Sequence, residues 1–258
     1  LPHTSTKMGD AVGRRQRCTE PMLSDKDRKD MADIVAREDA WMAERGVTWS
    51  VTRDYEELRR FGYEISGFLN TTFEPRVRQP GPADFWCRFT DQDDRTIGSV
   101  AIAIFQDCDL REAIKLGHLW YDDTPEWWLN RPDLDLDPVV AKGTVVHAGA
   151  IMVDRAWRKT AIDDAAGRFS THMIRLSRAL TLTRYDIDWW TGIFRSDMFE
   201  NRATLFAYSI NPDDCDLILD GFLPIMGFSD RIYLMQVPAP DMARALRDHM
   251  LINRPGER

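Results

Sequence analysis

The stretch "GAIMVDRAWRKTAIDDAAGRFSTHMIRLSRAL", residues 149–180, decides how this chain folds. An apolar run stops at Val153, a polar turn follows, and apolar residues then recur at helical spacing, so the stretch predicts a strand that feeds a helix through a loop. Such a loop can hold a phosphate, because the first N–H groups of a helix have no partner inside the helix. This loop, however, contains no glycine before Gly167.

The composition is that of a globular protein without a nucleic-acid surface. The chain has 258 residues, of which 43% are hydrophobic, enough for one large domain or for one domain with an extension. Its net charge is -8, and its densest basic block is the short "GRRQR" at 13–17. Because a surface that neutralises phosphates needs many clustered cations, we expect no nucleic-acid partner.

Other patterns argue against metal, disulfide and membrane classes. The four cysteines are far apart and form no CxxC pair. The acidic run "DLDLD" at 133–137 alternates with leucines and predicts an exposed strand edge or a turn rather than a metal site. No apolar run approaches the length of a membrane span, and the first residues lack the apolar section of a signal peptide. We therefore expect a cytoplasmic protein in which residues 1–23 form a flexible leader.

Two amphipathic helices are predicted in the first quarter of the chain. Residues 24–46 form an N-terminal helical extension, since Ser24 can cap the helix, acids follow in the first turn and Gly46 ends it. A second helix is predicted at 54–69, with an apolar stripe that runs to Phe68.

The remaining patterns alternate between strands and helices. In chain order they predict a strand at 47–52, strands at 84–90 and 96–105 that form an antiparallel hairpin, a helix at 109–121, a strand at 144–153, a helix at 163–183, a strand at 185–194, a short helix at 198–210, a strand at 231–238 and a closing helix at 240–251. This order predicts the α/β (α+β) class, with a mixed, mostly antiparallel sheet flanked by helices. Residues 47–258 would form this domain, behind the helical extension.

The order of elements from Thr48 to Pro238 resembles the GCN5-related N-acetyltransferase (GNAT) superfamily. In that family a Val ends the strand and an Arg or Gln stands five residues later, where it opens a six-residue loop with the pattern Q/R-x-x-G-x-G/A. Here Val153 is followed at that interval by Arg158.

Two later segments carry the same resemblance. "NRATLFAY" places Asn201 seven residues before Tyr208, as in the family's later helix, and this interval of about two turns puts both side chains on one helical face. "DGF" at 220–222 resembles the Gly-Phe that follows the family's Tyr, although here it comes after an insertion, "SINPDDCDLIL".

The resemblance implies an N-acyltransferase that moves an acyl group from acetyl-CoA or another acyl-CoA to an amine on a small molecule or a peptide. The reaction needs a neutral amine, N–H donors aimed at the developing oxyanion and an acid for the leaving sulfur. Tyr208 would be that acid, and Asn201 would lie beside the cofactor. The other implied cofactor-binding residues are those of the strand end and the loop, Ile151, Met152, Val153, Arg158, Lys159, Thr160, Ala161, Ile162 and Asp163.

His147 is the candidate base. It stands six residues before Val153, the offset at which some relatives carry a Glu that deprotonates the amine through water. An imidazole titrates in the range that this task requires. The alternative is that His147 is a satisfied polar residue inside the sheet, and the sequence leaves both open.

An acceptor pocket has four candidate residues, Trp120, Glu126, Trp128 and Trp190. Aromatic residues in an irregular segment can line an apolar pocket, and an acid beside them can receive a cationic amine. Such tryptophans also occur in ordinary cores. Trp189 and Trp190 must point to opposite faces of their strand, so at most one of them can face a pocket.

The loop departs from the family pattern at two positions, and the departure leaves the function open. Ala161 replaces the first glycine, and Asp163 replaces the final Gly or Ala and adds negative charge where a pyrophosphate would bind. Two alternatives therefore stand beside acyl-CoA chemistry: a donor on an acyl carrier protein, or a non-catalytic GNAT-like module that binds an acyl-CoA or another ligand. A third alternative is a ligand-binding regulator that acts through its N-terminal helix. The sequence also leaves open whether the protein forms a homodimer.

Overall fold

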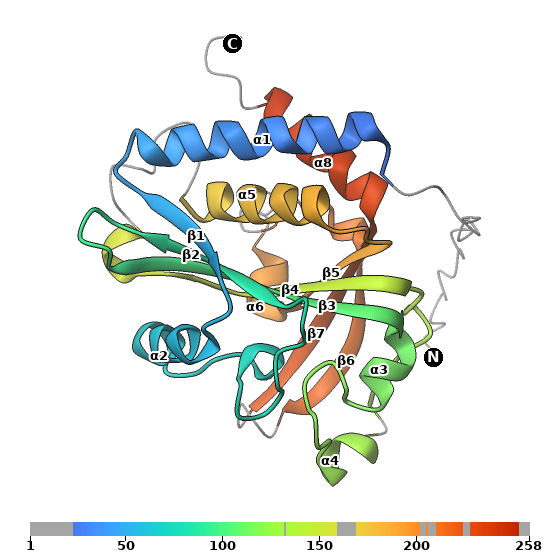
Figure 1. The fold of residues 1–258 in the computed structure, drawn as a ribbon. Coiled ribbons are helices and arrows are strands. Elements are labelled where there is room, and N and C mark those ends of the chain that lie inside the picture. Colours follow the sequence, from blue (N-terminus) through green and yellow to red (C-terminus); the bar gives the residue numbers. More distant parts are fainter. Residues whose placement is uncertain are drawn as a thin grey trace, which may run out of the picture.

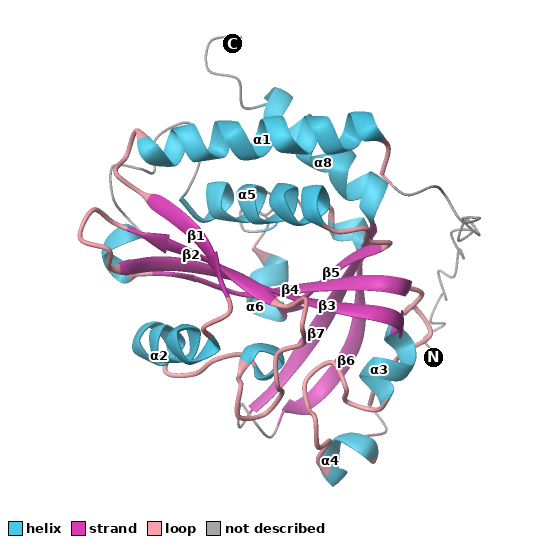
Figure 2. Cartoon of the chain, viewed as in Figure 1, coloured by secondary structure: helices cyan, strands magenta, loops and turns pink. Residues whose placement is uncertain are grey.

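The computed structural model of the protein describes residues 23–131, 133–158, 169–201, 205, 210–223 and 228–252. Within them the chain builds a seven-stranded sheet in the order β1-β2-β3-β4-β5-β7-β6 (Figures 1 and 2). The strands are β1 Thr48–Thr52, β2 Phe85–Thr90, β3 Thr96–Asp109, β4 Lys142–Val153, β5 Trp189–Arg195, β6 Cys215–Leu223 and β7 Phe228–Pro238. The helices are α1 Asp25–Ala43, α2 Tyr55–Ser66, α3 Leu110–Lys115, α4 Glu126–Leu129, α5 Phe169–Arg184, α6 Ser196–Glu200 and α8 Ala239–Ile252, with 3-10 turns η1 Thr71–Phe73, η2 Arg155–Trp157 and η3 Pro212–Asp214.

The expected mixed, mostly antiparallel sheet is confirmed. Neighbouring strands are antiparallel throughout the described sheet except for β4 and β5, which are parallel. A tight turn cannot join two parallel strands, so the chain has to cross over one face of the sheet between them. The helix α5 lies on this crossover.

Helices cover both faces of the sheet. Figure 1 shows α1, α5 and α8 on one side and α2, α3 and α4 on the other. Because both faces are covered, the central strands are apolar nearly throughout. In β3, Val100 and Ile102 join the core on the α5 side, whereas Ala101 and Ala103 join the core on the α2 side.

The helix α5 is enclosed on all sides, because α1 and α8 pack on the face that the sheet leaves open (Figure 1). Its buried residues therefore include polar ones, which need partners. Glu38 of α1 is buried among them, where it accepts a hydrogen bond from Nδ1 of His172 and pairs with Arg175 at 3.6 Å. The ring of Trp41 stacks on His172 with centroids 3.5 Å apart.

Charged contacts hold the rest of α1 in place. Arg247 of α8 pairs with Asp27 and, at 3.2 Å, with Asp30. Arg28 pairs with Asp186, just beyond the end of α5. The predicted extension is thus packed along its length against the helices that cover the sheet.

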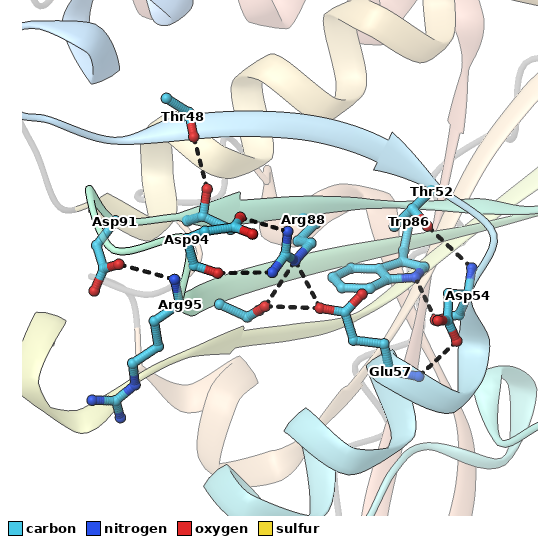
Figure 3. A network of polar contacts seen from close by, with 11 residues as sticks. Thr48, Thr52, Asp54, Glu57, Trp86, Arg88, Asp91, Asp94 and Arg95 are labelled. Atoms are coloured by element: carbon cyan, nitrogen blue, oxygen red, sulfur yellow. Dashed lines mark hydrogen bonds and ion pairs between the residues drawn. The ribbon is translucent and has the colours of Figure 1, made fainter.

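A polar network around Arg88 connects α2 to the β2–β3 hairpin (Figure 3). The guanidinium of Arg88 donates to the hydroxyl of Thr96 at 2.9 Å and to the carboxylate of Asp94 at 2.9 Å, and it pairs with Glu57 of α2 at 2.7 Å. Nearby, the indole N–H of Trp86 donates to the carbonyl of Asp54, the N-cap of α2. The start of α2 is therefore fixed to β2 and the β2–β3 hairpin.

Several predicted elements are confirmed with shifted ends. α1 begins behind Ser24, which forms the expected cap. The helix predicted at 54–69 ends at Ser66, because Gly67 adopts a left-handed φ of 78°, and Phe68 is therefore exposed rather than part of the apolar stripe. The helix predicted at 109–121 ends at Lys115 for the same reason, since Gly117 has a φ of 74°.

The end of the chain differs more from the prediction. The helix predicted at 198–210 is wrong as one unit, because α6 ends at Glu200 and Asn201 has an extended backbone. The strand β6 was not predicted: it begins at Cys215, inside the expected insertion before "DGF", and includes "DGF" itself. β6 lies at the edge of the sheet, and Leu134 forms a bridge to Leu219 on it, in agreement with the expected strand edge in "DLDLD".

Removing the carboxylate of Glu38 is expected to destabilise the fold. Glu38→Ala takes the anion away from buried Arg175 and His172, and breaking a buried ionic contact from one side costs about 3–5 kcal/mol. Urea unfolding measures the change. Asp33→Ala, at an exposed position of the same helix, is the matched control and should change the free energy of unfolding by less than about 0.5 kcal/mol. Equal effects of the two substitutions would show that Glu38 does not hold α1 in place.

Candidate functional site

The two parallel strands separate after four residue pairs. β4 pairs with β5 only over Val145–Ala148, opposite Trp189–Gly192. Beyond these pairs β4 continues beside β3 to Val153, and β5 continues beside β7. The sheet therefore opens into a wedge. Along residues 149–153, the described part of the chain provides no strand partner on the β5 side.

A β-bulge lies where the wedge opens. Gly149 pairs with Ala101 and Met152 with Ser99, so a step of three residues on β4 matches a step of two on β3. Ala150 has a φ of 46°, in the left-handed region, and its carbonyl accepts a hydrogen bond of 2.8 Å from the Ser99 hydroxyl. A bulge bends a strand and changes the direction of its backbone groups, and here it lies where the wedge opens.

Arg158 lies close to the end of β4, as its predicted position five residues after Val153 requires. Asp154 caps η2 through the N–H of Ala156 at 2.7 Å and pairs with Arg95 at 2.7 Å. Arg158 follows η2, and its Nε donates to the carbonyl of Val153 at 2.8 Å, so an exposed guanidinium folds back onto the strand end. The other predicted loop residues, Lys159, Thr160, Ala161, Ile162 and Asp163, lie outside the described residues.

The ring of His147 is fully buried, at the second-last pair before the wedge. It lies opposite Thr191 of β5, and its Nδ1 is 3.2 Å from the Thr191 hydroxyl. Its Nε2 is also buried and has no hydrogen-bond partner in the described chain. The ring of Phe73 lies beside it, with centroids 6.3 Å apart, and Phe73 also covers Gly149, where a Cβ would come within 2.7 Å of it.

The expectation that His147 titrates near neutral pH is wrong. Burial, together with the positive charge of Arg78, lowers the pKa of His147 from 6.5 to about 3. The imidazole is therefore neutral at neutral pH, and a base with so low a pKa is a poor acceptor for the proton of an amine. The alternative to a base was a polar residue whose hydrogen bonds are satisfied inside the sheet. This holds for Nδ1, which contacts Thr191, but not for Nε2, which has no partner in the described chain.

The predicted pair of Asn201 and Tyr208 cannot be tested as one helical face. Tyr208 lies outside the described residues. Asn201 is exposed, its backbone is extended, and its carbonyl accepts from the N–H of Leu205 at 3.2 Å. Asn201 therefore lies directly after the end of α6.

The four predicted acceptor residues do not form one pocket. Trp120 and Trp128 are buried and contact each other, with centroids 4.5 Å apart, in the core under α3. Trp190 is buried on the opposite face of the sheet, under Arg178. Glu126 is exposed. The expectation that Trp189 and Trp190 face opposite sides is confirmed, since Trp189 packs against the core that contains Trp120.

A cavity of about 550 Å³ lies between residues 78–83 and α3. One wall is Arg78, whose guanidinium is buried and bonded to the Asp84 carboxylate at 2.9 and 3.0 Å. The other oxygen of Asp84 accepts from the N–H of Ile104 in β3 at 2.8 Å. The sequence signal for this clamp was an Arg and an Asp that flank a Pro-Gly turn, and the sequence prediction did not include it.

A nucleophile is not found in this cavity. Cys108 lies in its wall, but burial and the nearby Asp109 raise the pKa of the thiol to about 11, so the thiol stays protonated. In the described part of the chain no group of three or more His, Cys, Asp or Glu residues is arranged to hold a metal ion. None of the described helices is long and apolar enough to cross a membrane.

Comparison with known proteins finds similarity only among solved structures. No family model and no curated protein matches the sequence. NAA60 of Arabidopsis thaliana in complex with acetyl-CoA is 15% identical and has a TM-score of 0.45 over 74% of this chain and 98% of that one. A GNAT-family acetyltransferase from Staphylococcus aureus Mu50 is 11% identical, with a TM-score of 0.40 over 74% and 98%. FeeM, an N-acyl amino acid synthase from uncultured soil microbes, is 10% identical, with a TM-score of 0.33 over 85% and 90%.

The burial of His147 predicts a pH-dependent loss of stability. Below pH 6.5 the unfolded chain binds a proton at this residue, whereas the folded protein does so only near pH 3. The free energy of unfolding therefore falls as the pH falls through this window, by up to about 1.4 kcal/mol per pH unit from this group. Urea unfolding at a series of pH values measures the slope.

His147→Gln removes the titrating group and should reduce that slope. His118→Gln, at an exposed histidine, is the matched control and should keep the wild-type slope. If both variants keep the wild-type slope, His147 is not the group that titrates between the two states.

Proposed function

We propose that the protein is an N-acyltransferase of GNAT type, which moves an acyl group from a thioester, acetyl-CoA or another acyl-CoA, to an amine. The observation that carries this proposal is the wedge between β4 and β5, with the bulge at Ala150 beside it and Arg158 at the strand end. A parallel pair that opens in this way offers one free strand edge to a ligand, without exposing the rest of the sheet.

The free edge of β4 matches the donor's extended arm. Backbone N–H and C=O groups at a strand edge bind an extended chain through hydrogen bonds, as in the addition of a peptide strand. The pantetheine arm of CoA is extended and carries amides, and we assign its contacts to Ile151, Met152 and Val153. The bulge at Gly149 and Ala150 would aim a backbone N–H at the acyl carbonyl, where negative charge develops.

The pyrophosphate is assigned to the loop behind the strand. Arg158 supplies an exposed cation whose position is fixed by its bond to the Val153 carbonyl. Lys159, Thr160, Ala161, Ile162 and Asp163, which precede α5 in the chain, would complete this site. The acid at Asp163 weakens the attraction for a pyrophosphate, so the contribution of Arg158 becomes more important.

The reaction balances without a metal or a redox group. A C–N bond forms, the C–S bond breaks, the nitrogen loses one proton, and the sulfur gains one. We assign the proton for the sulfur to Tyr208, with Asn201 beside the donor. His147 enters the proposal as a neutral hydrogen-bond acceptor and not as the base, because its pKa is far below neutral.

A carrier protein is the second candidate donor. Arg155 and Arg158 are both exposed at the end of β4, and this pair of cations would suit the acidic surface of an acyl carrier protein. The phosphopantetheine arm of such a carrier has no nucleotide, so the acid at Asp163 would not interfere with it. The wedge would receive the same arm in either case.

Acyl transfer itself is tested by thiol release. With acetyl-CoA or a longer acyl-CoA, and a panel of small amines and amino-terminal peptides, free thiol is expected to appear only when an amine is present. Mass spectrometry of the amine should show the acyl group. The absence of amine-dependent release with acyl-CoA and with an acylated carrier protein would reject the proposal in favour of a ligand-binding module.

Tyr208→Phe removes the proposed acid and is expected to lower kcat by about 100-fold, with little change in the Kd for acetyl-CoA. Tyr63→Phe is the matched control, because Tyr63 is exposed on α2, and it should leave kcat unchanged. An unchanged kcat in Tyr208→Phe would remove Tyr208 from the mechanism.

Arg158→Ala is expected to raise the Kd for CoA by about tenfold, as measured by calorimetry, because a charge-assisted contact with phosphate is lost. Arg155→Ala should leave the Kd for CoA unchanged. If a carrier protein is the donor, both substitutions should weaken binding of the carrier protein instead. An unchanged Kd for both donors in Arg158→Ala would exclude Arg158 from the donor site.

A further inference from the structure

Three buried polar side chains lie in a row across the sheet beside the wedge. His147 of β4 is opposite Thr191 of β5, and Thr191 is opposite Gln236 of β7. All three are buried. The amide of Gln236 accepts from the N–H groups of Val140 and Ala141 and donates to the carbonyl of Pro138. Within this row, the polar neighbour of His147 is Thr191.

The Thr191 hydroxyl has one hydrogen, and its bonds decide where that hydrogen points. Oγ1 donates to the carbonyl of Val146 at 2.8 Å, and a carbonyl can only accept. Toward Nδ1 of His147, 3.2 Å away, the same oxygen must therefore act as the acceptor. Nδ1 then carries the proton of the neutral imidazole, and Nε2 carries the lone pair.

Nε2, which carries the lone pair, is one of the buried polar atoms of the sheet that have no partner in the described chain, and Nε1 of Trp190 is another. A buried polar atom without a partner costs about 1–3 kcal/mol, so it is rarely retained without a role. Nε2 is buried and has no partner in the described chain. The nearby cation of Arg78 is bonded to Asp84 and opposes any positive charge on the ring, so the imidazole remains neutral.

The strand register places His147 next to the wedge. His147 and Thr191 form the second-last pair, and Ala148 and Gly192 form the last pair before the strands separate. Gly192 has no side chain, and the methyl group of Ala148 packs on the α5 face of the sheet, so neither residue of the last pair places a side chain beside the ring of His147. A ligand seated at the closed end of the wedge would therefore lie within one residue pair of His147.

We propose that Thr191 is a positioning residue that holds His147 as the Nδ1–H tautomer, so that Nε2 accepts a hydrogen bond from an uncharged N–H donor at the closed end of the wedge. The identity of that donor as the amine acceptor rests on the proposed acyl transfer. The tautomer does not, because it follows from the bonds of Thr191 alone. An acceptor at this point orients the lone pair of the amine toward the acyl carbon without taking its proton.

The tautomer is measured by NMR on the full chain with ¹⁵N-labelled histidine, with the His147 signals assigned through His147→Gln. In the wild type Nδ1 should give a pyrrole-type shift and Nε2 a pyridine-type shift. Thr191→Val removes the acceptor for Nδ1–H, and the ring should change to the other tautomer or to a mixture. Thr191→Ser keeps the hydroxyl and should restore the wild-type pattern.

A matched control separates the hydroxyl's local effect from a loss of packing. Thr181 of α5 is equally buried, and its hydroxyl also donates to a backbone carbonyl, that of Ser177 at 2.7 Å. Thr181→Val should lower stability to a similar degree but leave the His147 shifts unchanged. An Nε2–H tautomer in the wild type, or an unchanged pattern in Thr191→Val, would overturn the proposal.

Kinetics then test the N–H donor. Thr191→Val should lower kcat by about tenfold or more with the KM for the thioester unchanged, and Thr191→Ser should recover most of the loss. An unchanged kcat in a variant whose tautomer has changed would overturn the role of Nε2. A wild-type protein with the Nδ1–H tautomer and no acyl transfer to any amine would overturn the proposed function and leave the assignment to Thr191 intact.

Discussion

The parallel pairing of β4 with β5, limited to four residue pairs, is the constraint on which the rest of the structure depends. Because the strands are parallel, the chain must cross over the sheet between them, and this places α5 on one face. Because the pairing stops after Ala148, the strands separate, and beyond this point the edge of β4 has no strand partner among the described residues. The bulge at Ala150 lies beside this opening. The pairing of β4 with β5 therefore determines both where α5 lies and where the candidate site opens.

Burial of α5 accounts for the role of the N-terminal helix. A helix enclosed on every side needs partners for its polar residues, and α1 supplies Glu38 to His172 and Arg175. Burial alone lowers the pKa of Arg175, and the carboxylate opposes that shift. The predicted extension is thus part of the packing that supports the crossover. Asp27 and Asp30 of α1 also pair with Arg247 of α8, so these charged contacts connect the first and the last helix of the described chain.

Buried polar groups, rather than exposed ones, distinguish the candidate site. Arg78 and Asp84 form a buried ion pair that fixes the loop before β2, and Arg78 also opposes protonation of His147. Thr191 and Gln236 extend the polar row across β5 and β7. A neutral imidazole in such surroundings keeps one tautomer and one lone pair over a wide pH range. The tryptophans predicted for the acceptor pocket, Trp120, Trp128 and Trp190, by contrast belong to the cores on the two faces of the sheet.

The sequence by itself determined the local structure: Ser24 as a cap, the alternation in the hairpin, and the strand that ends at Val153 with Arg158 behind it. These follow from hydrogen bonds and spacing over a few residues. Only the tertiary structure decided that β6 forms an edge, that Trp120 and Trp190 lie on opposite faces, and that His147 is neutral. Pairing, burial and the field of a distant Arg78 depend on residues far apart in the chain, so no local pattern carries them.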